Sequence, residues 1–381
     1  MKDLKFKEPI LVTRPLLPPI EEYEKRLKEI WDNNWITNYG PLEREFQEKL
    51  KDFLNVENIE FFVNGHASLE VAIKALGLTG EVITTPFTFA STTQAIINNG
   101  LTPVYADVDE EYYNLDPDNI EDLITDKTSA IIPVHVFGNP CDVDKIEKIA
   151  KRNDLKVIYD AAHAFNVKID GNPIGSYGDI SMFSFHATKV FNTIEGGALM
   201  YDDNDLTYKF RSIKNFGITP DNEEVQFLGV NAKMNEFEAA MGLINLEYVE
   251  SAIAKRKIIY EKYLECLSNL EDQGRVKVLR PKDNVEYNYA YFTIKLNTFD
   301  EKDHLFNKLP EYNVYAKRYF YPPCNEFPAY DFEKNTPIAK NVSDTILSLP
   351  LYLDLTVEDV EKICKIIEIE LKWLWCFIHE Y

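Results

Sequence analysis

The feature that most constrains the fold is a regular alternation of short apolar strands and helices between residues 59 and 203. IEFFV is followed by HASLEVAIKALGL, EVITTPF by ASTTQAIINNG, and KVIYD follows the helical pattern of CDVDKIEKIAKRND. Strands that alternate with helices form mostly parallel sheets with helices on both faces. Continuous apolar runs such as SAIIPVHVFG fit burial on both sides of such a sheet. The sequence therefore predicts an α/β fold.

The pattern changes after about Gly242, and this change predicts a second domain. Helical periodicity predicts helices over 20–34, 42–55 and 118–124, and then one long helix over 239–267. A strand (YAYFTIKL), a short helix near 303–309 and a last amphipathic helix follow it. We therefore expect a large α/β domain over residues 1–245 and a smaller α+β domain over residues 246–381. A chain of 381 residues fits two domains of about 100–200 residues each.

Charge and cysteine usage argue against several classes of partner. The chain has 41 Lys and Arg against 63 Asp and Glu, a formal charge of −22, which repels nucleic acids and anionic membranes. No run of about 18 apolar residues predicts a membrane span, and the first residues lack the apolar core of a signal peptide. The five cysteines are irregularly spaced without a CxxC pair, which indicates neither a disulfide framework nor a zinc site. A cytoplasmic location fits best.

Two groups of polar residues follow predicted strands, where ligands bind in α/β sheets. The turn Asn64-Gly65-His66-Ala67-Ser68 opens a helix, and free N–H groups at a helix N-terminus bind phosphate. Asp160 ends the strand KVIYD, and His163 follows it. A carboxylate there suits the protonated ring nitrogen of pyridoxal phosphate (PLP). The plainer interpretations are an ordinary N-cap turn and an Asp that caps the next turn. A metal site lacks a recognisable third ligand.

Two later segments are further candidates. SFHATK follows the strand DISMF and ends in Lys189, whose apolar and small neighbours contain no other base. Burial lowers the pKa of a lysine and makes its amine a nucleophile towards aldehydes. The loop Gly229–Met234 precedes the helix NEFEAAMG. A surface lysine and a helix-capping loop are the alternatives for these two segments.

These pieces together, in this order, resemble the DegT/DnrJ/EryC1/StrS family of PLP-dependent sugar-nucleotide aminotransferases. The resemblance is carried by DAAHAF, GDISMFSFHATK and EGGAL, and extends through ITNYGPLEREFQEKL, PFTFASTTQAI and SDTILSLPLYLDLTVEDV. It covers the chain from about Leu16 to Ile367. It implies a fold-type I PLP-dependent transferase with an aspartate aminotransferase-like large domain, and a homodimer with shared active sites.

The resemblance also implies a role for each site residue. Lys189 matches the lysine that binds PLP covalently, and Asp160 matches the acid that pairs with the pyridine nitrogen. His163 matches a residue that contacts the cofactor ring, and Phe89 matches the aromatic side chain that stacks on it. The phosphate cradle corresponds to Gly65, His66, Ala67 and Ser184, with Asn231 contributed by the partner subunit. His66 stands where the family commonly has Thr or Ser.

The resemblance is greatest to enzymes that aminate C4 of a dTDP-4-keto-6-deoxyhexose, on the basis of FHATKVFNTIEGGAL and KRYFYPPCNEFPAY. L-glutamate is then the expected amino donor, 2-oxoglutarate its product, and deoxyamino-sugar biosynthesis for surface glycans such as O-antigen the expected setting. Amination at C3, or of a UDP- or GDP-linked ketosugar, is the alternative within this class. A regulatory or binding protein that has lost turnover is the alternative outside it. A Rossmann oxidoreductase is disfavoured because no Gly-rich fingerprint is present.

Overall fold

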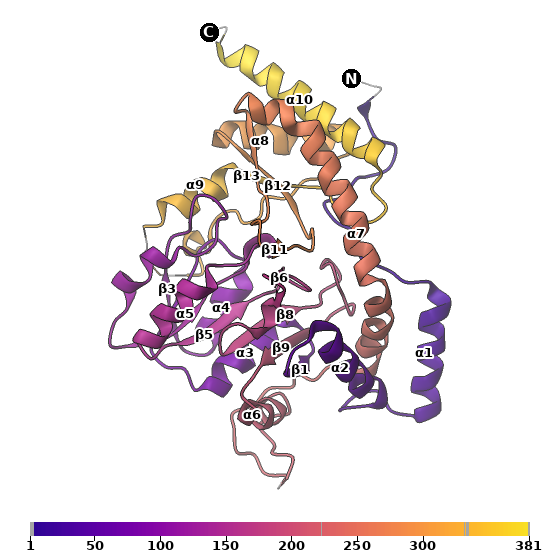
Figure 1. Cartoon of the computed structure of the whole chain (residues 1–381), viewed down its shortest axis with the longest axis vertical. Coiled ribbons are helices and arrows are strands. Elements are labelled where there is room, and N and C mark those ends of the chain that lie inside the picture. Colours follow the sequence, from indigo (N-terminus) through magenta and orange to yellow (C-terminus); the bar gives the residue numbers. More distant parts are fainter. Residues whose placement is uncertain (1–3, 222, 331, 333–334, 380–381) are drawn as a thin grey trace.

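The computed structural model describes residues 4–221, 223–330, 332 and 335–379, and its centre is a seven-stranded sheet (Figure 1). The strands lie in the order β1-β9-β8-β5-β4-β2-β3. β9 alone runs in the direction opposite to the other six strands, so the sheet is mostly parallel as expected. The strand bounds are β1 (Asn58–Phe62), β2 (Glu81–Thr84), β3 (Thr102–Tyr105), β4 (Thr128–Ile132), β5 (Lys156–Asp160), β8 (Ile180–Ser184) and β9 (Gly197–Tyr201).

Helices cover both faces of this sheet because successive residues of each strand point to opposite sides. In β5, Ile158 packs in the core beneath α3 and α4, whereas Val157 and Tyr159 pack against α5 on the other face. The helices over the first face are α3 (Gly65–Leu76), α4 (Ala90–Asn98) and α6 (Asp205–Ile213). Those over the second are α1 (Ile20–Asn33), α2 (Pro41–Leu54), α5 (Val143–Arg152) and the first half of α7 (Glu236–Asp272).

A smaller α+β unit is built on the second half of α7, which runs from one core to the other (Figure 1). The expected boundary at 245/246 thus falls inside one continuous helix. Phe6 and Ile10, from the start of the chain, pack in the core of this smaller unit. Its antiparallel sheet contains β10 (Val276–Val278), β12 (Phe292–Leu296) and β13 (Ile346–Leu349), and its helices are α8 (Phe299–Lys308), α9 (Pro337–Thr345) and α10 (Val357–His379).

A short sheet links the two units. It contains β11 (Val285–Glu286), which follows α7, and β6 (Lys168–Ile169) and β7 (Asn172–Pro173), which follow β5. β11 pairs antiparallel with β6. Among the described residues, no helix is long and apolar enough to cross a membrane.

Three elements differ from their expected form. The segment expected to be helical over 118–124 contains two 3₁₀ turns, Pro117–Asn119 and Glu121–Leu123. β4 ends at Ile132 because the next residue, Pro133, has no N–H to continue a ladder. The long helix begins at Glu236, since the Asn235 side chain accepts from the N–H groups of Phe237 and Glu238 in a capping box.

Candidate active site

A cavity of about 550 Å³ lies at the carboxyl edge of the parallel strands, and most of the predicted site residues line it. β1, β5 and β8 all end at this edge, so segments far apart in sequence meet there. The cavity wall includes seven predicted residues: Gly65, His66, Phe89, Asp160, His163, Ser184 and Lys189. Ala67 and Asn231 are the two predicted residues that do not line it.

Asp160 is a buried carboxylate that faces this cavity from the end of β5. Oδ2 accepts a 2.7 Å hydrogen bond from the Thr92 hydroxyl, and Oδ1 accepts one of 3.1 Å from the N–H of Ala162. Burial raises the pKa of Asp160, while these two bonds and the nearby Lys189 act in the opposite direction. A buried carboxylate with a raised pKa favours a cationic ligand, because a positive charge offsets the cost of its burial.

Lys189 enters the same cavity from the segment after β8, the strand beside β5. Phe185 and Phe191, which are both buried, flank it and pack edge to face with ring centroids 5.2 Å apart. These aromatic contacts fix both ends of the segment in the core. Burial lowers the pKa of Lys189 to about 8, and the opposing effect of Asp160 is smaller. The pKa of the side chain is therefore close to neutral pH, which suits an amine that both accepts and donates a proton.

His163 is held as a neutral ring beside this pair. Its Nδ1 accepts a 3.1 Å hydrogen bond from the backbone N–H of Phe137, which places the ring hydrogen on Nε2. Burial, with a further contribution from Lys189, keeps the pKa of His163 well below its ordinary range. The ring stacks parallel to Phe320 of the smaller unit, with centroids 6.0 Å apart.

The turn before α3 presents backbone donors to the cavity. The Asn64 side chain caps the helix by accepting from the N–H of Ala67 at 2.8 Å, so that donor is already used. Within the described chain, no acceptor is recorded for the N–H groups of Gly65 and His66. A Cβ on Gly65 would lie 2.9 Å from Ser184 Cβ, so only glycine permits this close approach of the turn to β8. The turn and Ser184 thus form one wall.

Phe89 occupies the N-cap position of α4 at the cavity mouth. Its side chain is 63% exposed although it is large and apolar. An exposed aromatic ring beside a cavity is suited to stacking on a flat ligand.

Asn231 lies outside this cavity, on an exposed loop that a buried ionic network anchors. Lys233 Nζ donates to Asn231 Oδ1 at 2.9 Å and to Asn215 Oδ1 at 2.7 Å. Lys214, which directly precedes Asn215 in the chain, also binds the loop of Asn231, because its carbonyl accepts a hydrogen bond from the N–H of Ala232. The position of Asn231 is therefore tied to that of Lys214.

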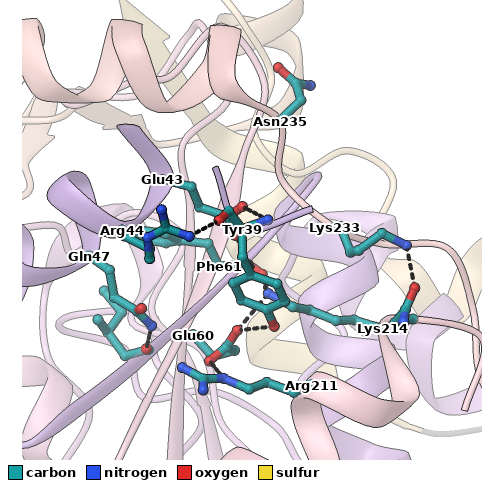
Figure 2. A network of polar contacts seen from close by, with 12 residues as sticks. Tyr39, Glu43, Arg44, Gln47, Glu60, Phe61, Arg211, Lys214, Lys233 and Asn235 are labelled. Carbon is teal, nitrogen blue, oxygen red and sulfur yellow. Dashed lines mark hydrogen bonds and ion pairs between the residues drawn. The ribbon is translucent and has the colours of Figure 1, made fainter. Parts of the chain in front are cut away.

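The network beneath the loop centres on Glu60, a fully buried carboxylate of β1 (Figure 2). Lys214 Nζ lies 2.6 Å and Arg211 Nε 3.1 Å from its oxygens, and the Tyr39 hydroxyl donates to it at 2.7 Å. Burial alone would raise the pKa of Glu60, but Lys214 and Arg211 hold it below its usual value. Because the buried charges of Glu60 and Lys214 are paired with each other and hydrogen-bonded, the fold tolerates their burial.

Several residues that line the cavity or support its wall were not predicted from the sequence. Thr92 is the partner of Asp160, and its only local signal is its place in PFTFAST. Tyr291, Tyr319 and Phe320 line the cavity from the smaller unit. Tyr319 and Phe320 belong to KRYFYPP, which marks the subtype by resemblance but carries no local sign of cavity contact.

The chain is similar to known aminotransferases over nearly its whole length. The family model for the DegT/DnrJ/EryC1/StrS aminotransferases matches residues 19–368. The dTDP-4-amino-4,6-dideoxy-D-glucose transaminase of Shigella dysenteriae is 41% identical over 363 residues, covering 94% of this chain and 98% of that protein.

Solved structures share the fold. DesI, solved in the presence of its TDP-sugar product, has a TM-score of 0.93 at 34% identity, covering 99% of this chain and 96% of that one. NtdA from Bacillus subtilis, with bound cofactor PMP, has a TM-score of 0.85 at 26% identity and covers 97% and 87%. These similarities confirm the expected fold-type I architecture. The chain belongs to the DegT/DnrJ/EryC1/StrS aminotransferase family.

Proposed function

We propose that this protein is a PLP-dependent aminotransferase that moves the amino group of L-glutamate to C4 of dTDP-4-keto-6-deoxyglucose. The observation that carries the proposal is the convergence of Lys189 and Asp160 on one cavity, from the adjacent strands β5 and β8. A nucleophilic amine and a buried carboxylate are the two groups that this cofactor requires. The similarity to a curated C4 transaminase supports the choice of sugar.

The cavity residues fit PLP group by group. Asp160 would accept the hydrogen of the protonated pyridine nitrogen, which supplies the positive charge that its burial favours. The N–H groups of Gly65 and His66, with Ser184, would receive the phosphate. Phe89 and His163 would contact the ring. When bound, PLP supplies an electron sink for the negative charge that develops at Cα of the amino donor.

Lys189 would act as the base in the transfer. Because its pKa is lowered to about 8, roughly a tenth of the amines is uncharged at pH 7 and free to accept a proton, far more than at the ordinary lysine pKa of about 10.4. Lys189 would take the proton from Cα of the donor and deliver it to C4′ of the cofactor, and it would move a proton in the reverse direction for the ketosugar. Asp160 would keep the ring nitrogen protonated throughout.

The walls of the cavity would limit the access of water. Tyr291, Tyr319 and Phe320 close it from the smaller unit, and Phe89 stands at its mouth. Exclusion of water strengthens the interaction of Asp160 and Lys189 with a bound charge.

The proposed enzyme is a homodimer in which Asn231 completes the phosphate site of the partner subunit. Asn231 is exposed and does not line the cavity of its own chain. The connection between α6 and α7, which contains Asn231, also exposes apolar side chains, with Phe216 52% and Leu228 90% accessible. Exposed apolar residues beside a functional residue favour an interface.

The proposed cellular setting is the cytoplasm, in deoxyamino-sugar synthesis for surface glycans such as O-antigen. The described cysteines, Cys141, Cys266, Cys324 and Cys364, are all free thiols. Free thiols are typical of a reducing compartment.

A substrate panel tests the proposed function. Enzyme converted to its amine form with L-glutamate is mixed with dTDP-, UDP- and GDP-4-ketosugars, and the products are examined by NMR. We expect nitrogen at C4 of the dTDP-sugar and release of 2-oxoglutarate in the first step. Nitrogen at C3, or turnover confined to UDP- or GDP-sugars, would contradict the assignment of the dTDP-4-ketosugar as the substrate. Absence of any glutamate-dependent transfer would favour a binding or regulatory protein.

A further inference from the structure

His66 joins two helices at the wall of the cavity. It is the second residue of α3, and its Nδ1 lies 2.9 Å from Ser91 Oγ in the first turn of α4. Its Nε2 lies 3.3 Å from Glu70 Oε1, one helical turn further along α3. His66 and Ser91 both line the cavity that contains Lys189, whereas Glu70 stands behind them.

The carboxylate of Glu70 is itself held in place by a hydrogen bond. Asn98, near the end of α4, donates a 2.7 Å hydrogen bond to Glu70 Oε1. Within the described residues, Glu70 is the one acidic side chain in an ion-pair contact with His66. The other ionisable side chains of the cavity wall are Asp160, His163, His186, Lys189, Glu195, Tyr291 and Tyr319.

The donor and acceptor properties of His66, Ser91 and Glu70 allow two arrangements of the hydrogens between them. An ionised carboxylate only accepts hydrogen bonds, so His66 Nε2 carries a hydrogen that points to Glu70. If Nδ1 has no hydrogen, the Ser91 hydroxyl donates to it and has none left for the cavity. If Nδ1 is protonated, Ser91 accepts from His66, and its own O–H is free to donate to a ligand.

An anion in the cavity selects the second arrangement. A nearby negative charge favours the charged form of an imidazole, and the second arrangement offers that anion both a positive charge and a hydroxyl donor. The first arrangement offers neither.

We propose that His66, Ser91 and Glu70 form a relay in which Ser91 is a phosphate ligand and His66 positions it. The proposal rests on the assignment of PLP above and extends it to the phosphate subsite. The relay would give the phosphate cradle a hydroxyl donor through Ser91. The Ser91 hydroxyl would act beside the two backbone N–H groups of Gly65 and His66, for which the described chain provides no other acceptor.

Cofactor binding to the full-length apoenzyme tests the relay without turnover. PLP and pyridoxal, which lacks the phosphate, are each titrated into wild-type, Ser91→Ala, Ser91→Thr and Glu70→Gln enzymes. Loss of a hydrogen bond to a charged group predicts that Ser91→Ala weakens PLP about tenfold. Pyridoxal affinity stays within about twofold, since that ligand makes no phosphate contact. Ser91→Thr retains the hydroxyl and restores PLP affinity, whereas Glu70→Gln, which removes only the charge, has a smaller effect.

A double-variant cycle distinguishes the relay from general damage. His66→Thr places a hydroxyl in the turn itself, so adding Ser91→Ala to it costs less than about twofold instead of tenfold. Ser251→Ala, on α7 and remote from the cavity, is the matched control for loss of a serine hydroxyl. Circular dichroism verifies that each variant is folded.

Three outcomes would overturn the relay. They are an unchanged PLP affinity in Ser91→Ala, an equal loss for PLP and pyridoxal, and additive losses in the cycle. If the wild-type apoenzyme did not bind PLP at all, the proposed function would fail before the relay is reached.

Discussion

The hydroxyl of Thr92 donates a 2.7 Å hydrogen bond to Oδ2 of Asp160, so the first turn of α4 holds the carboxylate at the end of β5. The two residues are separated by 68 positions in the chain. The bond lowers the pKa of a carboxyl that burial raises, and Asp160 lines the cavity that also contains Lys189.

Replacement of Thr92 tests this relationship. In Thr92→Val the carboxylate loses a donor, its pKa rises further, and its hold on a protonated ring nitrogen weakens. We expect kcat to fall about tenfold, in line with a hydrogen bond to a charged group of about 1.5–3 kcal/mol. Thr92→Ser keeps the hydroxyl and should retain most of the activity. Steady-state kinetics on both variants checks this, and equal losses in the two would exclude the hydrogen bond as the cause.

The pH dependence of PLP uptake reports the state of Lys189. Only the uncharged amine attacks an aldehyde, and burial lowers the pKa of Lys189 to about 8. The uptake rate of the apoenzyme should therefore rise with pH and level off above about 8, instead of continuing to rise towards the ordinary lysine value of about 10.4. Stopped-flow absorbance measures this rate.

Asp160→Asn gives this experiment its internal control. The charge of Asp160 raises the pKa of Lys189 and partly offsets the effect of burial. Removing that charge should move the inflection of the uptake rate to lower pH. An inflection that moves upward, or a wild-type inflection near the ordinary lysine value, contradicts the electrostatic interpretation of this pair.

Subunit mixing tests whether Asn231 acts across a dimer. In Lys189→Ala the proposed base is missing, and in Asn231→Asp a negative charge faces the proposed phosphate. A mixed dimer should contain one site with both wild-type residues and one with neither, so its activity should exceed that of either parent. The measurement is activity after subunit exchange, with exchange verified by mass spectrometry. No recovery, or full activity in a monomer by sedimentation, would refute the shared site.

The network around Glu60 should contribute strongly to stability. Glu60→Gln leaves Lys214 buried without its closest counter-charge, and breaking a buried ion pair costs about 3–5 kcal/mol. The matched control is Glu147→Gln, which breaks an exposed pair with Lys151 and should cost no more than about 1 kcal/mol. Urea denaturation gives both free energies of unfolding. Similar values for the two variants would show that the buried pair has no special role.

The local sequence determined the order of the elements and the place of the main polar residues. Alternating apolar and helical patterns predicted the sheet, because periodicity depends only on near neighbours. Parallel strands end at one edge, so residues after β1, β5 and β8 could be expected to meet without knowledge of the packing. The family resemblance supplied their roles. The early end of β4 at Pro133 and the start of α7 at the Asn235 cap also had local signals, which the expected ranges overlooked.

Only the tertiary structure decided which side chains touch. The bond from Thr92 to Asp160, the contact of His66 with Ser91, and the stacking of Phe320 on His163 join segments 25 to 157 positions apart, a span no local pattern covers. The same is true of Phe6 and Ile10, which pack in the core of the smaller unit at the other end of the chain. Local periodicity records which face of an element is buried, whereas the partner on that face depends on how distant elements pack together.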